Sequence, residues 1–458
     1  MKVFKQNTKE KVFMLCIFIW GLIMSFLIPT WQIPDESAHI QEIFMALGEK
    51  DFATTFEQSV GIEKGRIETH PEEKVNKEEL WNAMSKEPDY RKSDAALKSV
   101  QPYVLKRLPA TIGIMLGIIL GLPSYWTLQL GEIFALIFYI YVCYKALALM
   151  PMKKETLAVF IGMPIIVQQS GSVGYDAVVI PLMFYFIAYI FYLRYEKENV
   201  VLKDLLILIL CWLLIAYIKM PYLFIGLLFL MIPRNKFKVT FGRKMVIDAR
   251  IINKWRFPTL IVLSILCVIG IYLQRHNLWI QVVYGFCVEW KRGIYLIYMT
   301  AKTWWRYLVV SSVGQFGWLD APIAFGAAIA VYVITFIFSI INSSRNDVKI
   351  RKWDCLILWG TFLILTLFTV LSMTNHTIMV TLFGSEQAEA TYNIREAMYA
   401  IPYIGGLQGR YFTPYLFLLF APFGQVKQIS EKKSTFIFAA FEIILTIYIF
   451  NILIQRYW

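Results

Sequence analysis

Long apolar segments separated by short polar connectors run through most of the chain, and they predict membrane-spanning helices. The first segment ends near Thr30, and we expect further spans over 125–150, 157–169, 176–193, 205–218, 221–232, 258–273, 322–341, 355–372, 412–423 and 435–453. The segment 108–124 is also apolar, but a full crossing there would invert the basic loops that follow it. We therefore expect about eleven spans, with 108–124 re-entrant or non-crossing where protein covers it.

Composition supports an integral membrane protein. Apolar residues make up 58% of the 458 residues, charged residues make up 17%, and the mean hydropathy is +0.56. The basic N-terminus leads into an apolar segment of nearly spanning length without a small-residue cleavage site, so we expect a retained first span. The six cysteines are scattered singly and indicate no disulfide framework. The predicted fold class is an all-α, polytopic membrane protein with one domain over residues 1–458.

Charge orients this protein in the membrane. The segment 234–257 carries eight Lys/Arg against one acid, which is the signature of a cytoplasmic loop. The segment 31–107 carries fifteen acidic and eleven basic residues, so we expect a large extracytoplasmic first loop with short helices. The N-terminus is then cytoplasmic and the protein is multi-pass in the cell membrane. The net charge of +13 is explained by loops that face anionic lipid, and no nucleic-acid partner is expected.

The stretch "PDESAHIQE" follows the first span directly. Pro34 suits a helix start, and Asp35, His39 and Glu42 then share one helical face. Carboxylates in a first helical turn are stabilised by the helix dipole, so a capping role is one interpretation. The other is catalytic, because Asp35 with Glu36 beside it can deprotonate a hydroxyl or bind a divalent cation.

Four further residues at the predicted ends of spans are candidates. Asp176 in "GYDAVV" and Asp320 in "GWLDAP" can each cap a helix or serve a site. Arg410 in "QGRYFTP" can grip a phosphate with two parallel hydrogen bonds or extend to the membrane interface. Lys219 in "YIKMPY" has the same two options. In the predicted topology these residues and the four histidines lie on the external side: His39, His70, His276 and His376. Polar groups at one membrane face can converge on a single cavity, whereas a channel would distribute them through the depth.

The motifs "PDESAH", "YDA", "GQFGWLDAP" and "QGRYFTP" occur in this order between Pro34 and Pro414. Together they resemble a family of bacterial predicted membrane proteins of unassigned function that is grouped with the GT-C glycosyltransferases. The resemblance implies a GT-C-like bundle of about 11–13 transmembrane helices, an acidic first external loop with a catalytic Asp, and a polyprenyl-phosphate-linked sugar as donor.

Roles follow from this resemblance residue by residue. Asp35 matches the acid after the first span, with Glu36 and His39 as its catalytic companions. Asp176 matches the second acid, and with Asp35 it is the expected ligand of a divalent metal, Mg or Mn. Asp320 matches the acid of "GWLD", and Gln408 with Arg410 matches the "QGR" element. We expect these three residues to bind substrate and phosphate, together with Lys219, which the pattern of polar residues at span ends adds.

The predicted function is therefore transfer of a sugar from a polyprenyl-phosphate donor to a cell-surface glycan or glycolipid on the extracytoplasmic side. A polysaccharide polymerase or ligase remains open, because it handles similar donors. A transporter or flippase of lipid-linked sugars is the other alternative, although such proteins usually carry internal repeats and midplane polar residues. The sequence contains no Gly-rich phosphate loop, so no soluble nucleotide cofactor is expected.

Overall fold

The structure is a computed structural model, and it describes residues 8–47, 74–85, 100–241, 244–248, 251, 254, 272–273, 277–342, 350–383, 393–424, 427–428 and 430–458. Helices dominate these residues, and the strands form only short two-stranded sheets. The predicted all-α, polytopic membrane fold is confirmed.

The helices and strands follow one another in this order. The first part contains α1 (Thr8–Leu27), α2 (Glu36–Ala46), α5 (Lys77–Ser85), η3 (Pro102–Arg107), α6 (Leu108–Leu120), α7 (Ser124–Leu149), α8 (Lys154–Gly162), α9 (Pro164–Ser170), α10 (Asp176–Tyr195), α11 (Leu202–Ile218), η4 (Met220–Met231), η5 (Arg234–Lys236), β1 (Lys238–Phe241) and β2 (Lys244–Asp248). The second part contains α13 (Leu278–Val288), α14 (Trp290–Val313), β3 (Gln315–Phe316), β4 (Ala321–Pro322), α15 (Phe325–Ile340), β5 (Ile341–Asn342), α16 (Lys352–Phe383), α17 (Ile394–Ala400), η6 (Gly409–Tyr411), α18 (Thr413–Phe420), β6 (Lys427–Gln428) and α19 (Glu431–Tyr457).

Six of the described helical segments are long and apolar enough to cross a membrane. They are Lys9–Leu27, Pro102–Leu120, Ser124–Leu149, Asp176–Tyr195, Lys352–Thr381 and Lys432–Tyr457. Met220–Met231, Trp279–Val288 and Phe325–Ile340 are shorter apolar helices. The expected span over 258–273 lies outside the described residues, so the count of about eleven stays a prediction.

The segment after Leu108 is a helix that packs closely on its neighbour. A Cβ on Gly113 would lie 2.4 Å from the carbonyl oxygen of Leu130, and a Cβ on Gly117 would lie 2.8 Å from Oγ1 of Thr127. Glycine at these two positions lets α6 and α7 approach backbone to backbone, as small residues do between membrane helices. With η3 before it, α6 reaches spanning length, and whether it crosses stays a prediction.

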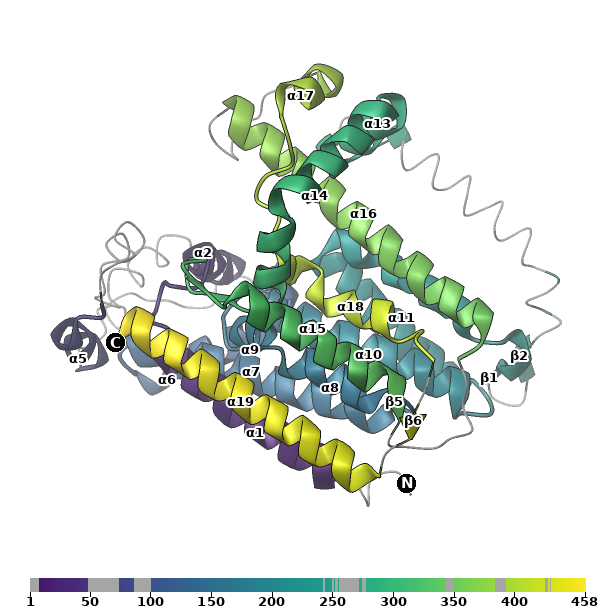
Figure 1. The fold of residues 1–458 in the computed structure, drawn as a ribbon, viewed down its shortest axis with the longest axis horizontal. Helices are drawn as coiled ribbons and strands as arrows, with labels where there is room; N and C mark the ends of the chain where they lie inside the picture. Colours follow the sequence, from purple (N-terminus) through teal and green to yellow (C-terminus); the bar gives the residue numbers. More distant parts are fainter. Residues whose placement is uncertain are drawn as a thin grey trace.

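Helix α10 is the centre of the bundle. In its membrane-length window 83% of the residues are buried, against 22–39% in the other long helices. It packs against α7, α11, η4, α9 and α18, while α1 and α19 lie side by side along the edge (Figure 1). Because its twenty residues span about 30 Å, its two ends belong to opposite ends of the bundle.

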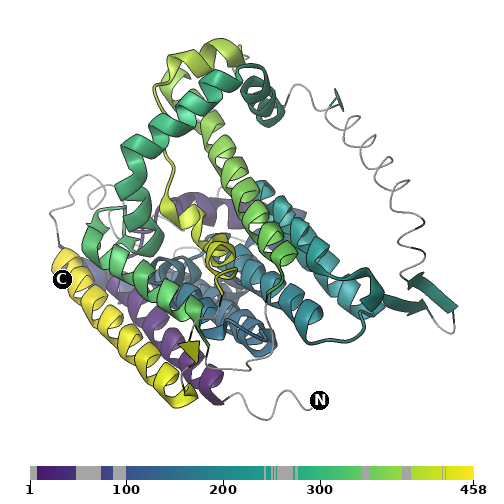
Figure 2. The ribbon, with the colours of Figure 1, turned by 45° about the vertical axis from the view of Figure 1, so that its right-hand side comes forward.

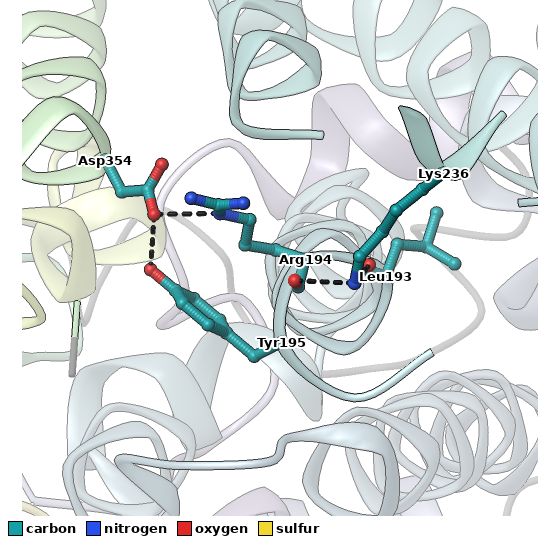
Figure 3. A network of polar contacts seen from close by, with 5 residues as sticks. All are labelled: Leu193, Arg194, Tyr195, Lys236 and Asp354. Atoms are coloured by element: carbon teal, nitrogen blue, oxygen red, sulfur yellow. Dashed lines mark hydrogen bonds and ion pairs between the residues drawn. The ribbon is translucent and has the colours of Figure 1, made fainter. Parts of the chain in front are cut away.

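Buried ionic contacts fix the C-terminal end of α10 (Figure 3). Arg194 Nε donates to Asp354 Oδ2 of α16 at 2.8 Å, and the hydroxyl of Tyr195 donates to the same oxygen at 2.7 Å. Lys236, in the segment predicted to be a basic cytoplasmic loop, donates from Nζ to the carbonyl oxygens of Leu193 and Arg194, each at 2.8 Å. The basic segment is therefore anchored at the end of α10 that is opposite to Asp176.

A small second core stands away from the main bundle. Helices α14 and α16 rise out of the bundle and carry α13 and α17 near their ends (Figures 1 and 2). Val282, Leu296, Ile378 and Met398 belong to the buried cluster that joins these four helices. The connection from α17 then returns to η6, which places Arg410 back against the bundle.

Candidate functional site

The connection between α1 and α2 holds Asp35 in an unusual conformation. The backbone φ is 66° at Asp35 and 70° at Trp31, which is the left-handed region that non-glycine residues seldom adopt. The carboxylate of Glu36 accepts a hydrogen bond from the backbone N–H of Trp31 at 2.7 Å, and Trp318 Nε1 donates to the carbonyl oxygen of Trp31. Strained backbone conformations that surrounding contacts hold in place are frequent at functional sites.

This geometry corrects the sequence-based helix start. Helix α2 begins at Glu36, and Asp35 is the residue before it, with no side-chain capping bond. A left-handed Asp35 turns out of the helical pattern that would have placed it on one face with His39 and Glu42. Its side chain is 64% exposed, whereas Glu36 as a residue is only 2% exposed. Asp35 is therefore the accessible carboxylate of the pair.

His39 is held by a buried arginine from the start of α6. Arg107 Nη2 lies 2.7 Å from His39 Nδ1 and also pairs with Glu42. Because arginine can only donate, Nδ1 accepts and the proton of the neutral ring is on Nε2. Burial and the nearby Arg107 charge lower the pKa of His39 to about 3. His39 is therefore a neutral hydrogen-bond donor rather than a base at neutral pH.

Asp176 begins α10 and pairs with Lys219, which follows α11. Lys219 Nζ lies 3.2 Å from Asp176 Oδ1. The same ammonium lies 5.4, 5.1 and 4.8 Å from the ring centroids of Tyr175, Tyr222 and Tyr411. A cation among three aromatic faces is stabilised by the negative charge of each face. This arrangement keeps Lys219 charged and fixed although its side chain is only 16% exposed.

Arg410 reaches the same place through a close backbone approach. Gly409 lies against α14, where its N–H donates to Ser311 Oγ at 2.7 Å, and a Cβ there would lie 2.0 Å from the carbonyl oxygen of Leu308. Only glycine fits at this contact. Arg410, the next residue, is 6% exposed, and its Nη2 lies 4.0 Å from Asp35 Oδ2, the outer limit of an ion pair.

These groups border one small pocket between α2, the α9–α10 junction and η6. Its lining residues are Ile33, Pro34, Asp35, Glu36, His39, Gln169, Ser172, Gly174, Tyr175, Asp176, Arg410 and Tyr411. Residues from three distant parts of the sequence therefore meet, and Lys219 joins them through Asp176. The site combines the exposed carboxylate of Asp35 with Arg410, a cation that lines the pocket, and with Lys219, a cation held beside the pocket by Asp176.

Comparison with known proteins places most of the chain in one family. The model of a family described as predicted membrane protein (DUF2142) matches residues 18–419. The chain belongs to the DUF2142 family. No curated protein and no solved structure matches the chain. The family description establishes a membrane protein and names no activity.

Three of the four expected binding residues lie outside the pocket lining in this DUF2142 protein: Lys219, which pairs with the lining residue Asp176, and Asp320 and Gln408. Asp320 pairs instead with the C-terminal helix α19, where Arg456 Nε donates to its Oδ2 at 2.5 Å. It lies in the turn between β3 and β4, in which Gly317 (φ 60°) and Leu319 (φ 65°) are left-handed. Gln408 precedes η6 and its backbone carbonyl accepts from the N–H of Tyr411. The geometry gives Asp320 a role in fixing this turn.

Two of the four histidines belong to the described part of the chain. His39 lines the pocket, and His376 lies in α16 beside Gly406. His70 and His276 lie outside the described residues.

Sequence reasoning missed Arg107, Gln169 and Tyr175. Arg107 stands at the start of the apolar segment 108–124, whose position relative to the first loop no local pattern reveals. Gln169 and Tyr175 flank the small residues of "QSGSVGY", and only their nearness to Asp176 marked them. Their contribution depends on the turn between α9 and α10, which tertiary packing sets.

The expected divalent metal would need several oxygen donors that are free to bind it. Among the described residues no group of three or more His, Cys, Asp or Glu side chains could hold a metal ion. Asp176 is already paired with Lys219, and Arg410 Nη2 lies 4.0 Å from Asp35 Oδ2. Fixed cations in these positions replace the charge that a metal would supply, so the donor set does not fit Mg or Mn.

Proposed function

We propose that this DUF2142 protein is a membrane glycosyltransferase. In this proposal it moves a sugar from a polyprenyl-phosphate-linked donor to a hydroxyl of a cell-surface glycan or glycolipid. The observation that carries the proposal is the pocket in which the exposed carboxylate of Asp35 faces the buried Arg410 at 4.0 Å. Lys219, paired with Asp176 beside it, adds a second fixed cation.

The position of the pocket supports this interpretation. Asp176 is at the first residue of α10, and the basic segment that follows η5 is anchored at the last turns of α10 by Lys236. The positive-inside rule assigns the basic segment to the cytoplasm. The pocket then faces the extracytoplasmic leaflet, where the phosphate of a lipid-linked sugar lies at headgroup depth.

The proposed reaction is a displacement at the anomeric carbon of the donor sugar. Asp35 accepts the proton of the acceptor hydroxyl, and the oxygen of that hydroxyl forms a bond to the anomeric carbon. The bond between this carbon and the phosphate oxygen breaks, and its electron pair remains on the departing polyprenyl phosphate. Arg410 and Lys219 stabilise the negative charge that develops there, and their fixed positions avoid reorganisation during the reaction. In this proposal the neutral ring of His39 offers its Nε2–H as a further hydrogen-bond donor in the site.

Two observations favour Asp35 as the general base of the proposed reaction. Its side chain is 64% exposed, so an acceptor can reach it. Asp176 is held by Lys219 at 3.2 Å, and the carboxylate of Glu36 accepts from the backbone of Trp31. The proposed reaction uses no metal, because Arg410 and Lys219 already supply fixed positive charge beside the carboxylates.

The test compares surface glycans of cells that express the wild type, Asp35→Asn or Arg410→Ala at equal membrane levels. We expect each substitution to reduce the transferred sugar by at least about 100-fold, the range for loss of a general base or of an oxyanion donor. Glu78→Gln is the matched control, because Glu78 is an exposed acid in the first turn of α5 and is not among the pocket-lining residues.

The product separates the related activities. One added sugar with accumulation of the lipid-linked donor in the variants supports a glycosyltransferase. A missing ladder of repeats or a missing whole chain supports a polymerase or a ligase. If Asp35→Asn leaves the glycan unchanged while gene deletion alters it, the proposed chemistry is wrong and transport of a lipid-linked sugar becomes the better hypothesis.

A further inference from the structure

Gln169 presents an unused donor to the pocket. It is the penultimate residue of α9, it is 5% exposed, and it lines the pocket beside Asp176 and Arg410. Its side-chain Nε2 has no hydrogen-bond partner within the described part of the chain. A buried amide N–H without an acceptor is destabilising, and such groups are rare in native proteins. Because Gln169 also lines the pocket, a ligand that enters the pocket can supply the missing acceptor.

Arg410 has a second unused donor in the same pocket. Its Nε is buried and likewise has no partner among the described residues, while its Nη2 lies at the outer limit of contact with Asp35. A guanidinium that offers Nε and one Nη toward the same side has the geometry for bidentate contact with a phosphate or carboxylate. The two unused donors come from α9 and η6, which are about 240 residues apart in sequence, and they line one small pocket.

The chemistry of the two donors selects the class of ligand. Both groups donate and neither accepts, so they match a group that only accepts hydrogen bonds, such as a phosphate oxygen. A sugar hydroxyl both donates and accepts hydrogen bonds, and these two donors would leave its proton without an acceptor. Arg410 and Lys219 supply positive charge here, and each has a carboxylate beside it, Asp35 at 4.0 Å and Asp176 at 3.2 Å.

We propose that Gln169 Nε2 and Arg410 Nε form a preformed oxyanion site for the phosphate of an isoprenoid phosphate ester, with Gln169 as its neutral donor. This inference deepens the proposed function, on which it rests for the identity of the lipid. Gln169 contacts the phosphate directly and holds it where the sugar–phosphate bond faces Asp35. The carboxylates of Asp35 and Asp176 repel an anion, so the phosphate is held through the donors of Arg410 and Gln169.

The test measures ligand binding by purified full-length protein in detergent, without any transfer reaction. Farnesyl phosphate is the lipid probe, inorganic phosphate is the headgroup probe, and farnesol controls for the apolar chain. Affinity is measured by calorimetry, and the midpoint of thermal unfolding is recorded for every variant without ligand. We expect farnesyl phosphate to bind more tightly than inorganic phosphate, and farnesol to show no dependence on Gln169.

The variants remove the donor with little change of shape. Gln169→Met keeps the length of the side chain, and Gln169→Glu replaces the donor by an acceptor of the same size. We expect Gln169→Met to weaken farnesyl phosphate binding by about 10-fold or more, as for a lost hydrogen bond to a charged group, and Gln169→Glu to weaken it further. One variant is apolar and the other is charged, so they do not share a single cause of misfolding. If one of them fails to fold, binding is measured with the other.

Gln168→Met is the matched control. Gln168 is the preceding residue of α9, it is 3% exposed, and neither its Nε2 nor its Oε1 has a partner among the described residues. It differs from Gln169 in that it does not line the pocket. We expect Gln168→Met to bind both phosphate probes as the wild type does.

Three results would overturn this inference: no binding of either phosphate probe by the wild type, unchanged affinity in both Gln169 variants, or equal weakening in Gln168→Met. These outcomes are separable from the proposed function. If binding depends on Gln169 while Asp35→Asn leaves surface glycans unchanged, the phosphate site stands and the transferase proposal fails. If Asp35→Asn abolishes transfer while both Gln169 variants bind normally, only the present inference fails.

Discussion

A single methyl group at Gly409 is expected to displace the arginine of the pocket. An added Cβ would lie 2.0 Å from the carbonyl oxygen of Leu308 and 2.3 Å from the backbone nitrogen of Ser312. Both atoms belong to the backbone of α14 and cannot rotate away as a side chain can. Real Cβ contacts shorter than 3.0 Å are essentially absent, so Gly409→Ala requires η6 to move by at least about 1 Å.

The expected loss of activity follows from this displacement. Arg410 is the next residue, and its Nη2 lies 4.0 Å from Asp35 Oδ2. A shift of about 1 Å in a group that stabilises the transition state can reduce the rate by about 100-fold. Overpacking of this kind also costs about 1–3 kcal/mol of stability, and the hydrogen bond from the Gly409 N–H to Ser311 Oγ is strained with it.

The assay pairs sugar transfer in membranes with the midpoint of thermal unfolding in detergent. Gly326→Ala is the control, because a Cβ on this α15 residue would meet no atom within 4 Å. In that exposed helical position alanine is expected to be neutral or to stabilise by up to about 1 kcal/mol. If Gly409→Ala matches Gly326→Ala in both transfer and stability, the contact between η6 and α14 does not position Arg410 and the reasoning is refuted.

Three further predictions concern charges. Asp354→Asn should lower stability by about 3 kcal/mol or more, because it leaves Arg194 buried without its anionic partner, and urea or thermal unfolding would measure this loss. Asp176→Asn and Lys219→Met should each destabilise by a similar amount, whereas the double variant should lose less than the sum; an additive double-mutant cycle would contradict their pairing. Because the pKa of His39 falls from 6.5 to about 3 on folding, its contribution to stability is present above pH 6.5 and is lost as the pH falls towards 3. The wild type should therefore lose stability between pH 6.5 and 4 more steeply than His39→Gln, and parallel unfolding curves would argue against a buried neutral ring.

The sequence by itself determined the membrane class and most helices. Apolar segments of spanning length produce α1, α7, α10 and α19 within about four residues of the expected ranges, since in a bilayer each backbone polar group must be satisfied within its own helix. Helix α16 begins three residues before its expected range of 355–372 and ends eleven residues after it. The candidate residues that the motifs marked also include most of the polar pocket lining: Asp35, Glu36, His39, Asp176 and Arg410. Placing a polar residue beside an apolar segment costs free energy unless the residue has a partner or a function. Such residues therefore stand out in the sequence.

Tertiary structure alone decided which of these residues act together. Asp320 has the same local features as Asp176, an acid before an apolar helix, yet it pairs with Arg456 more than a hundred residues later. Arg107 and Gln169 have no periodic or motif signal, and they enter the site because α6 packs on α7 and α9 turns into α10. Local pattern fixes which residues form a helix, because neighbours in sequence share its hydrogen bonds. The partner of a buried charge is fixed instead by how helices pack, and Gly409 against α14 is the contact that brings Arg410 to Asp35.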